Sequence, residues 1–199
     1  MNRRELLEVF ARYRGNAPAV TGPSFGGRVL REVAHEPATL YNMELAYPTA
    51  VCLGLALALP DQHVYAVEGD GSMIAGMATL TTVARYAPAN LVVLVVNNRS
   101  FASTGAQPTA EAAGTDLVQV ARGAGIAQAV RVDDVAGVEA AFRHATTVPG
   151  PHLIVADVGP ENVKTAGASQ AYPFDIVEAA ITFRRTLEDR GLVPTIWAV

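Results

Sequence analysis

The sequence predicts a doubly wound α/β fold, in which a mostly parallel sheet carries helices on both faces. Short apolar runs alternate with amphipathic segments along most of the 199 residues, and neither an internal repeat nor a low-complexity linker interrupts them. The run LVVLVV at residues 91–96 is unbroken, which is typical of a central parallel strand. Strands that alternate with helices are joined by right-handed crossovers, and this arrangement puts helices on both faces.

In the first half of the chain, each element is predicted from its apolar spacing. Helices are expected at residues 3–13, after Ser24, at 49–59 and at 72–86, and strands at 17–21, 38–41, 64–68 and 91–96. Residues 3–13 repeat apolar side chains on one helical face, and Ser24 is a suitable N-cap. Pro48 suits the first turn of the next helix, which is apolar on every side and is therefore expected to be buried.

The second half continues the alternation. Helices are expected at residues 116–124, 135–147 and 174–190, and strands at 128–132 and 152–157. The longest irregular stretches, 98–115 and 159–173, both follow a strand. Ligands of open α/β sheets bind beyond the carboxyl ends of the strands, so function is expected at that edge.

Length and composition limit the function classes. One domain, residues 1–199, is expected from the length. Half of the residues are hydrophobic and the mean hydropathy is +0.23, so we expect another subunit to cover some apolar surface. The net charge of −4 and the scattered basic residues argue against nucleic acid. The longest apolar run, residues 50–59, is about half of the ~20 residues that span a bilayer, so no membrane segment is expected.

The N-terminal residues and the cysteine content indicate a cytoplasmic protein. Glu5 and Glu8 interrupt the apolar residues near the N-terminus, unlike a secretion signal. Cys52 is the only cysteine, so no internal disulfide can form, and its apolar surroundings suggest a small core residue.

The stretch GDGS, Gly69 to Ser72, joins a predicted strand to a predicted helix. The glycines permit a sharp turn and close approach of a ligand, and the first N–H groups of the helix, with the Ser72 hydroxyl, would attract an anion. Asp70 would repel a bare phosphate at this position. A divalent cation between them removes the conflict, since Mg²⁺ takes carboxylate and phosphate oxygens together.

A second polar pair supplies the missing ligand. Asn97 and Asn98 end the predicted strand 91–96, with 25 residues between Gly71 and Asn97, enough for a helix back across the sheet and a strand forward again. Neither GDG nor NN is specific alone. Their spacing at two strand ends is much more specific, and the sequence has no GKS or GKT and no GxGxxG around the glycines.

This pattern resembles the signature of thiamine-diphosphate enzymes, in their diphosphate-binding (PP) domain. The similarity runs from about Val20 to Gly125 and includes LGLALALP, VEGDGSM, APANLVVLVVNN and STGAQPT. Within that family it is most similar to sulfopyruvate decarboxylase β subunits and phosphonopyruvate decarboxylases. The resemblance implies the PP-type fold, thiamine diphosphate and Mg²⁺ as cofactors, and these site residues: Asp70, Asn98 and the carbonyl of Ser100 on the metal, and Gly69, Gly71, Ser72 and Met73 in the diphosphate turn, with Asn97 supporting.

The stretch YNMELAYPTA, residues 41–50, aligns with the family segment that bends the cofactor. The resemblance implies that Leu45 is the apolar wedge beneath the cofactor and that the Met43 carbonyl contacts the aminopyrimidine. Met43, Glu44 and Ala46 replace the small residues usual there. Glu44 either contacts cofactor or substrate or is a solvated residue at the edge, and both readings stay open.

The resemblance also implies a partner. In this family the glutamate that activates the cofactor comes from a PYR domain, which a single PP domain lacks, so the active site is expected at an interface with a PYR-domain (α) subunit in a hetero-oligomer. The expected activity is decarboxylation of a small 2-oxo acid, whose identity stays open. The alternatives are an acetolactate-synthase-like carboligase subunit and a non-catalytic assembly subunit.

The remaining conspicuous residues receive structural readings. The four histidines lack metal-ligand spacing, and Met73 and Met77 are expected in the core. Ser103, Thr104 and Gln107 could line the active site or only cap the diphosphate. Arg99 could meet an anionic substrate or lie at the surface, Lys164 has no assigned role, and the apolar tail with Trp197 is expected against the partner.

Overall fold

The computed structural model describes residues 1–23, 25–159 and 175–195, and within them it contains the predicted parallel sheet. Six strands lie in the order β2-β1-β3-β4-β8-β7, and every pairing is parallel. Their bounds are β1 (Ala19–Thr21), β2 (Thr39–Leu40), β3 (Val64–Gly69), β4 (Leu91–Asn97), β7 (Gln128–Val132) and β8 (His152–Asp157). The order confirms the doubly wound α/β class.

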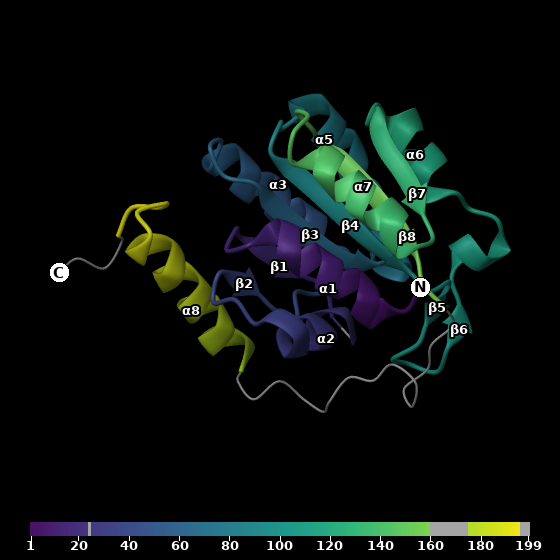
Figure 1. The fold of residues 1–199 in the computed structure, drawn as a ribbon, viewed down its shortest axis with the longest axis horizontal. Helices are drawn as coiled ribbons and strands as arrows, with labels where there is room; N and C mark the ends of the chain where they lie inside the picture. The colour runs from purple at the N-terminus through teal and green to yellow at the C-terminus, as the bar shows by residue number, and fades with distance from the viewer. Residues whose placement is uncertain (24, 160–174, 196–199) are drawn as a thin grey trace.

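Helices cover both faces of this sheet, as Figure 1 shows. One face carries α1 (Arg3–Arg14), α2 (Phe25–Ala34) and α7 (Val135–Ala145). The other carries α3 (Pro48–Ala58), α5 (Thr79–Tyr86) and α6 (Leu117–Ala124). Helix α8 (Ile176–Asp189) packs at the β2 edge, where Phe183 and Leu187 join the core.

The central strands are apolar because they have a core on each side. All seven residues of β4 are buried. Val93 and Val95 contact the α3, α5 and α6 side, whereas Val92 and Leu94 contact the α1 and α7 side. Side chains of successive strand residues point to opposite faces, so a strand between two helical layers needs apolar residues at every position. This packing fixes the strand ends from which the pocket loops leave.

The chain crosses in opposite directions from β1 and β3. From β1 it passes through α2 to β2 on one side, and from β3 it passes to β4 on the other. A crevice opens at such a topological switch point, beyond the carboxyl ends of the strands. The loops after β1 and β3 therefore diverge around a ready-made ligand site.

Two predicted elements differ from the structure. The helix expected at residues 72–86 is two helices, α4 (Asp70–Ala75) and α5, with a break at Gly76. The helix α4 ends against the loop before α3, where a Cβ on Gly76 would lie 2.5 Å from the Ala46 carbonyl oxygen. The stretch 98–115, expected to be irregular, contains the antiparallel pair β5 (Ser100–Phe101) and β6 (Gln107–Pro108) and the 3-10 helix η1 (Ala110–Ala113).

Two burial predictions were also wrong. Helix α3 is not buried on every side, because Leu57 is 47% exposed, and Met77 is 45% exposed outside the core although Met73 is buried. Both exposed side chains are apolar, so the cause is an apolar surface that the chain itself does not cover. Cys52 is buried as predicted.

Several predictions lie outside the described residues: the cap at Ser24, the start of the last helix at residue 174, the loop with Lys164, and Trp197. In the part of the chain that is described, no helix has both the length and the apolar character needed to cross a membrane.

Candidate cofactor-binding site

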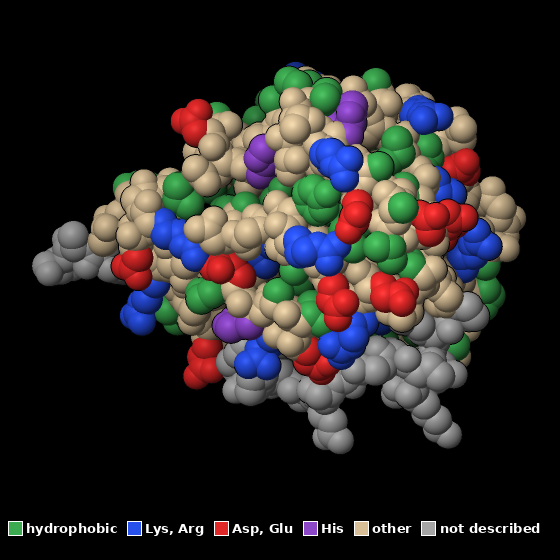
Figure 2. All heavy atoms as spheres, viewed as in Figure 1, with side chains coloured by type: hydrophobic (Ala, Val, Ile, Leu, Met, Phe, Trp, Pro, Cys, Tyr) green, Lys and Arg blue, Asp and Glu red, His purple; other side chains and the backbone are tan. Residues whose placement is uncertain are grey.

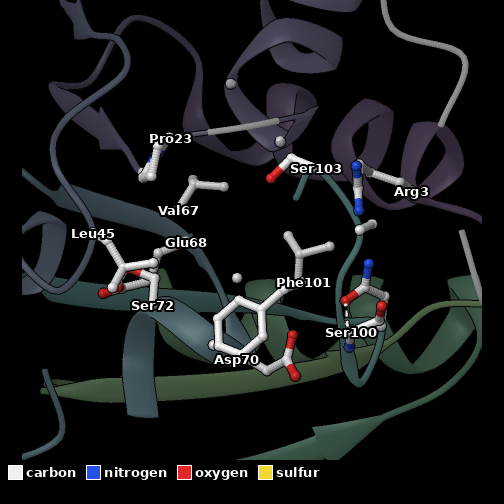
Figure 3. A pocket seen from close by; sticks show the side chains of 18 of the residues that line it. Arg3, Pro23, Leu45, Val67, Glu68, Asp70, Ser72, Ser100, Phe101 and Ser103 are labelled. Atoms are coloured by element: carbon white, nitrogen blue, oxygen red, sulfur yellow. Dashed lines mark hydrogen bonds between the residues drawn. The ribbon is translucent and has the colours of Figure 1, made fainter. Parts of the chain in front are cut away.

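A pocket of about 210 Å³ lies at the switch point, between the loops that follow β1, β3 and β4. Figure 3 shows its side chains, which come from segments far apart in the sequence. The residues that matter below are Arg3, Gly22, Leu45, Glu68, Gly69, Asp70, Gly71, Ser72, Asn98, Ser100 and Phe101. The pocket therefore gathers the predicted motifs at one edge of the sheet.

The GDGS turn positions a buried carboxylate. Gly69 caps α4, which begins at Asp70, two residues earlier than predicted. The Asp70 side chain is 1% exposed, and its Oδ2 accepts a hydrogen bond of 2.5 Å from Thr109 Oγ1. Burial raises the pKa of Asp70, because a charge in a dry site is penalised. Among the described residues, no arginine or histidine forms an ion pair with this carboxylate.

The β4 end lies next to the GDGS turn. Gly69 pairs with Val96 in the parallel register, so Asp70 and Asn97 follow side by side. Asn98 Oδ1 accepts a 3.0 Å hydrogen bond from Ser100 N, which folds the loop tightly around the left-handed Arg99 (φ 58°). Ser100 Oγ is buried without a hydrogen-bond partner among the described residues. A buried polar atom without a partner is uncommon, and this residue also lines the pocket.

Asn97 faces away from this pocket. Its Nδ2 donates to Asp157 Oδ1 at 2.7 Å and to Glu111 Oε2 at 3.2 Å. The two asparagines thus have different surroundings: Asn97 contacts Asp157 and Glu111 outside the pocket, and Asn98 lines the pocket. The supporting role of Asn97 stays a prediction.

Behind Asn97 lies a cluster of three carboxylates that form ion pairs with arginine. We call Glu111, Asp116 and Asp157 the paired acids. Arg131, on β7, donates to all three, at 2.8 Å to Glu111, 3.3 Å to Asp116 and 2.7 Å to Asp157. Burial alone would lower the pKa of Arg131. Its hydrogen bond to Glu111 and the charges of Asp157 and Glu111 outweigh burial, so the pKa of Arg131 is raised. The sheet order brings β7 beside β8, and so places the guanidinium here.

The segment Asn42 to Tyr47, which we call the wedge loop, closes another side of the pocket. Leu45 lines the pocket and is 41% exposed. Asn42 and Ala46 have left-handed φ values of 59° and 78°, which are costly for residues other than glycine. The Ala46 N–H donates to Ser72 Oγ at 3.0 Å, so the wedge loop is tied to the GDGS turn.

Sequence reasoning missed a second buried acid, Glu68, at the end of β3. It is 3% exposed and accepts from two hydroxyls, Thr49 Oγ1 at 2.5 Å and Ser72 Oγ at 2.6 Å. Burial raises the pKa of Glu68 despite these two donors. The Ser72 proton is therefore directed to Glu68 in this structure, and the backbone N–H groups of the turn are what remain for an anion.

Most of the predicted cofactor-binding residues meet in the pocket. Leu45, Gly69, Asp70, Gly71, Ser72, Asn98 and Ser100 line it, whereas Met43 and Met73 do not. The Met73 side chain lies in the core and Met43 packs against it, so only their backbones could contact a ligand.

Three residues whose roles the sequence left open, Glu44, Arg99 and Gln107, lie outside the pocket. Glu44 is exposed and outside the pocket. Arg99 is turned to Asp157, with 3.3 Å between Nη2 and Oδ2. Gln107 donates to the Thr104 carbonyl in the loop between β5 and β6, and Thr104 itself lines the pocket.

Two residues that the sequence did not single out complete the pocket. Arg3, at the start of α1, is 5% exposed and lies over the Phe25 ring. Phe101 packs on Gly71 so closely that a Cβ on this glycine would lie 2.2 Å from the ring. An aspartate between two glycines can be recognised in a sequence as a candidate site residue. An arginine in an amphipathic helix, such as Arg3, cannot.

Relatives of known name share the sequence. The chain is 27% identical over 163 residues to the sulfopyruvate decarboxylase subunit beta of Methanococcus maripaludis, covering 81% of this chain and 86% of that one. It is 31% identical to phosphonopyruvate decarboxylase of Streptomyces hygroscopicus, covering 80% of this chain but 40% of that one. The chain thus matches most of the former and less than half of the latter.

Solved structures share the fold. A putative thiamin diphosphate-dependent enzyme from Mycobacterium smegmatis superposes with a TM-score of 0.68 at 22% identity, over 80% of this chain and 32% of that one. The family model for the C-terminal TPP-binding domain of thiamine pyrophosphate enzymes matches residues 28–156, which contain the wedge loop, the GDGS turn and both asparagines. The chain belongs to the thiamine pyrophosphate enzyme family, as its C-terminal TPP-binding domain.

Proposed function

We propose that this chain is the diphosphate- and Mg²⁺-binding subunit of a two-component thiamine-diphosphate-dependent 2-oxo acid decarboxylase, of the sulfopyruvate or phosphonopyruvate type. It is catalytic only with a PYR-domain subunit. The observation that carries the proposal is the parallel pairing of β3 with β4, which sets Asp70 beside the Asn98 to Ser100 loop in one pocket.

The residues present fit the cofactor and its metal. Asp70 Oδ1, Asn98 Oδ1 and the Ser100 carbonyl would form an all-oxygen donor set of the kind that Mg²⁺ prefers. The described residues contain no cluster of three or more histidine, cysteine, aspartate or glutamate side chains suited to a metal, so this mixed set is the candidate. The unpartnered Ser100 Oγ, which lines the same pocket as Asp70 and Asn98, supports a polar ligand there.

Bound thiamine diphosphate supplies an electron sink for breaking a carbon–carbon bond beside a carbonyl. The chain's part is to hold the cofactor. Asp70 and the N–H groups of the turn would fix its charged end, and Leu45 would support its rings from below. The two acids of the pocket, Glu68 and Asp70, are both committed to hydrogen bonds, so the activating glutamate is expected on the partner.

An uncovered apolar surface beside the pocket supports the partner. Leu45, Tyr47, Leu57 and Met77 are each between 41% and 58% exposed. They belong to adjoining segments, because α3 follows the wedge loop and Gly76 packs on Ala46. Exposed apolar residues next to a ligand site are typical of an interface. The PYR subunit would cover this surface and close the pocket.

The test is cofactor binding by the assembled complex, with a partner subunit encoded in a neighbouring reading frame. Asp70→Ala should abolish binding of thiamine diphosphate in the presence of Mg²⁺, measured by calorimetric titration. Asp61→Ala is the matched control, since Asp61 is an exposed aspartate near the other end of β3, and it should bind normally. An unchanged affinity of Asp70→Ala for thiamine diphosphate would contradict the proposed function.

Product analysis then separates decarboxylation from carboligation. With a single 2-oxo acid as substrate, a decarboxylase releases the aldehyde, whereas an acetolactate-synthase-like enzyme forms an acyloin. Sulfopyruvate, phosphonopyruvate and pyruvate compared at equal concentration identify the substrate class. A complex that binds the cofactor but converts none of them would favour the assembly role.

A further inference from the structure

Glu68 lies where three parts of the pocket meet, although it belongs to none of the recognised motifs. Its backbone is confined from the β1 side, since a Cβ on Gly22 would lie 3.4 Å from the Glu68 Cβ. Its carboxylate accepts from the second residue of α3 and from the GDGS turn, through Thr49 and Ser72. No basic side chain in the described ranges forms an ion pair with it, so its donors are the two hydroxyls and the Thr49 backbone N–H.

The Ser72 hydroxyl connects this carboxylate to the wedge loop. A hydroxyl has one proton and can rotate to suit its partners. Because the proton goes to Glu68 at 2.6 Å, a lone pair of Ser72 Oγ is left facing the Ala46 N–H at 3.0 Å. Glu68 thus orients the hydroxyl as an acceptor for the wedge loop.

The wedge loop needs such a support. Ala46 has a left-handed φ of 78°, a conformation that alanine keeps only where the surroundings hold it. Glu68 brackets the end of the loop, holding Ala46 through Ser72 and Thr49 directly. Leu45 lies immediately before this bracketed stretch and protrudes into the pocket, as Figure 3 shows.

We propose that Glu68 is a positioning residue, which acts through Ser72 and Thr49 to hold Leu45 at a fixed height above the diphosphate turn. The inference rests on the proposed function, because Leu45 matters only where a cofactor lies against it. It predicts that loss of the Glu68 link lets the wedge move while the metal and diphosphate ligands stay in place. Catalysis then falls more than cofactor affinity.

The experiment compares Glu68→Gln, Ser72→Ala and the double variant in the complete complex, with kcat and the Kd for thiamine diphosphate measured separately. Glutamine keeps the shape but can accept with only one of its two terminal atoms, so one hydroxyl loses its acceptor. Each single variant should lower kcat about 10- to 100-fold, as misplacement by a fraction of an ångström to 1 Å does. The Kd should change less than about threefold, and the double variant should be no worse than the singles, because both act on one link.

Two further variants keep the outcome readable. Thr49→Val removes one hydroxyl donor to Glu68, and valine has nearly the same shape as threonine. The hydrogen bond from Ser72 to Glu68 stays intact, so the effect on kcat should be smaller than that of Ser72→Ala. Glu8→Gln, at an exposed position on α1, is the control for a charge change and should behave as the wild type. If Glu68→Gln fails to fold, Ser72→Ala alone decides the question.

The results separate this inference from the proposed function. Loss of cofactor binding in Asp70→Ala together with normal kcat in Glu68→Gln or Ser72→Ala would overturn only the positioning role. Effects of Glu68→Gln and Ser72→Ala that add in full would also overturn it, because they would be independent. If the wild-type complex binds no thiamine diphosphate, the proposed function itself fails.

Discussion

Two groups of carboxylates lie at the same edge of the sheet, and the chain treats them in opposite ways. The paired acids behind Asn97 share the Arg131 guanidinium at 2.7 to 3.3 Å, and Asp157 also pairs with Arg99 at 3.3 Å. The pocket acids, Glu68 and Asp70, accept hydrogen bonds from hydroxyls and form no ion pair among the described residues. Burial raises the pKa of both pocket acids.

The difference separates acids that the chain pairs with its own arginine from acids that it leaves without an ion pair. A buried carboxylate without a counter-charge is costly, so a protein retains it where a metal or ligand completes the site. The paired acids hold the Asn97 to Ser100 loop in shape, and the pocket acids face the space that this loop encloses. The two groups of acids thus lie at the same edge of the sheet with opposite electrostatic surroundings.

Removal of the built-in cation should have the largest effect. Arg131→Met leaves three carboxylates together, of which the Glu111 side chain is only 3% exposed. Breaking a buried pair leaves an uncompensated charge, so the free energy of unfolding should fall by about 3 kcal/mol. Urea unfolding of the isolated subunit at pH 7 measures this, and Arg131→Lys should be intermediate because lysine lacks the planar fork. A loss below about 1 kcal/mol would show that the cluster is solvated in solution.

Replacing one acid of each group by its amide should lower the free energy of unfolding by less than Arg131→Met does. The loss should be larger in the paired acids than in the pocket acids. Glu111→Gln weakens contacts with Arg131, Asn97 and the Leu117 N–H, and should cost about 2 kcal/mol. Asp70→Asn removes a buried charge that no cation balances, so the cofactor-free subunit should change by less than about 1 kcal/mol. The same unfolding measurement compares the two. The contrast fails if Asp70→Asn is the more destabilising.

The sequence predicted the half of the site that depends on local order. GDGS and NN each end an apolar run, and one short crossover between them makes β3 and β4 neighbours, so the meeting of Asp70 with Asn98 follows from the chain order alone. The break at Gly76 did not follow, because it results from contact with Ala46, 30 positions earlier. Local periodicity carries no information on such contacts.

The two acid groups were not predictable for a related reason. In β3 every residue from Val64 to Glu68 is buried, so no alternation of polar and apolar side chains reveals which way Glu68 points. Arg131 reaches Glu111 and Asp157 only because β7 lies next to β8 at the end of the sheet. Which non-consecutive strands become neighbours is set by the packing of all the helices together. A single sequence does not reveal this order.

The smallest predicted effect lies at the opposite end of β8, whose carboxyl end carries Asp157. His152, at its amino end, is 3% exposed and its Nε2 lies 2.8 Å from the Val148 carbonyl oxygen, with His144 and His63 nearby. Burial lowers the pKa of His152 from its ordinary 6.5, so the folded protein holds it neutral.

The pH dependence of stability follows from that direction. The unfolded chain binds the proton more readily, so the contribution of neutral His152 is present above pH 6.5 and is lost as the pH falls through 6.5 toward the folded pKa. His152→Gln keeps a donor for Val148 and should flatten the decline between pH 7.5 and about 5.5, measured by urea unfolding at several pH values. His35, whose pKa burial also lowers, should account for part of what remains. An unchanged slope in His152→Gln would mean that this end of the sheet opens to water, unlike the end that holds the paired acids.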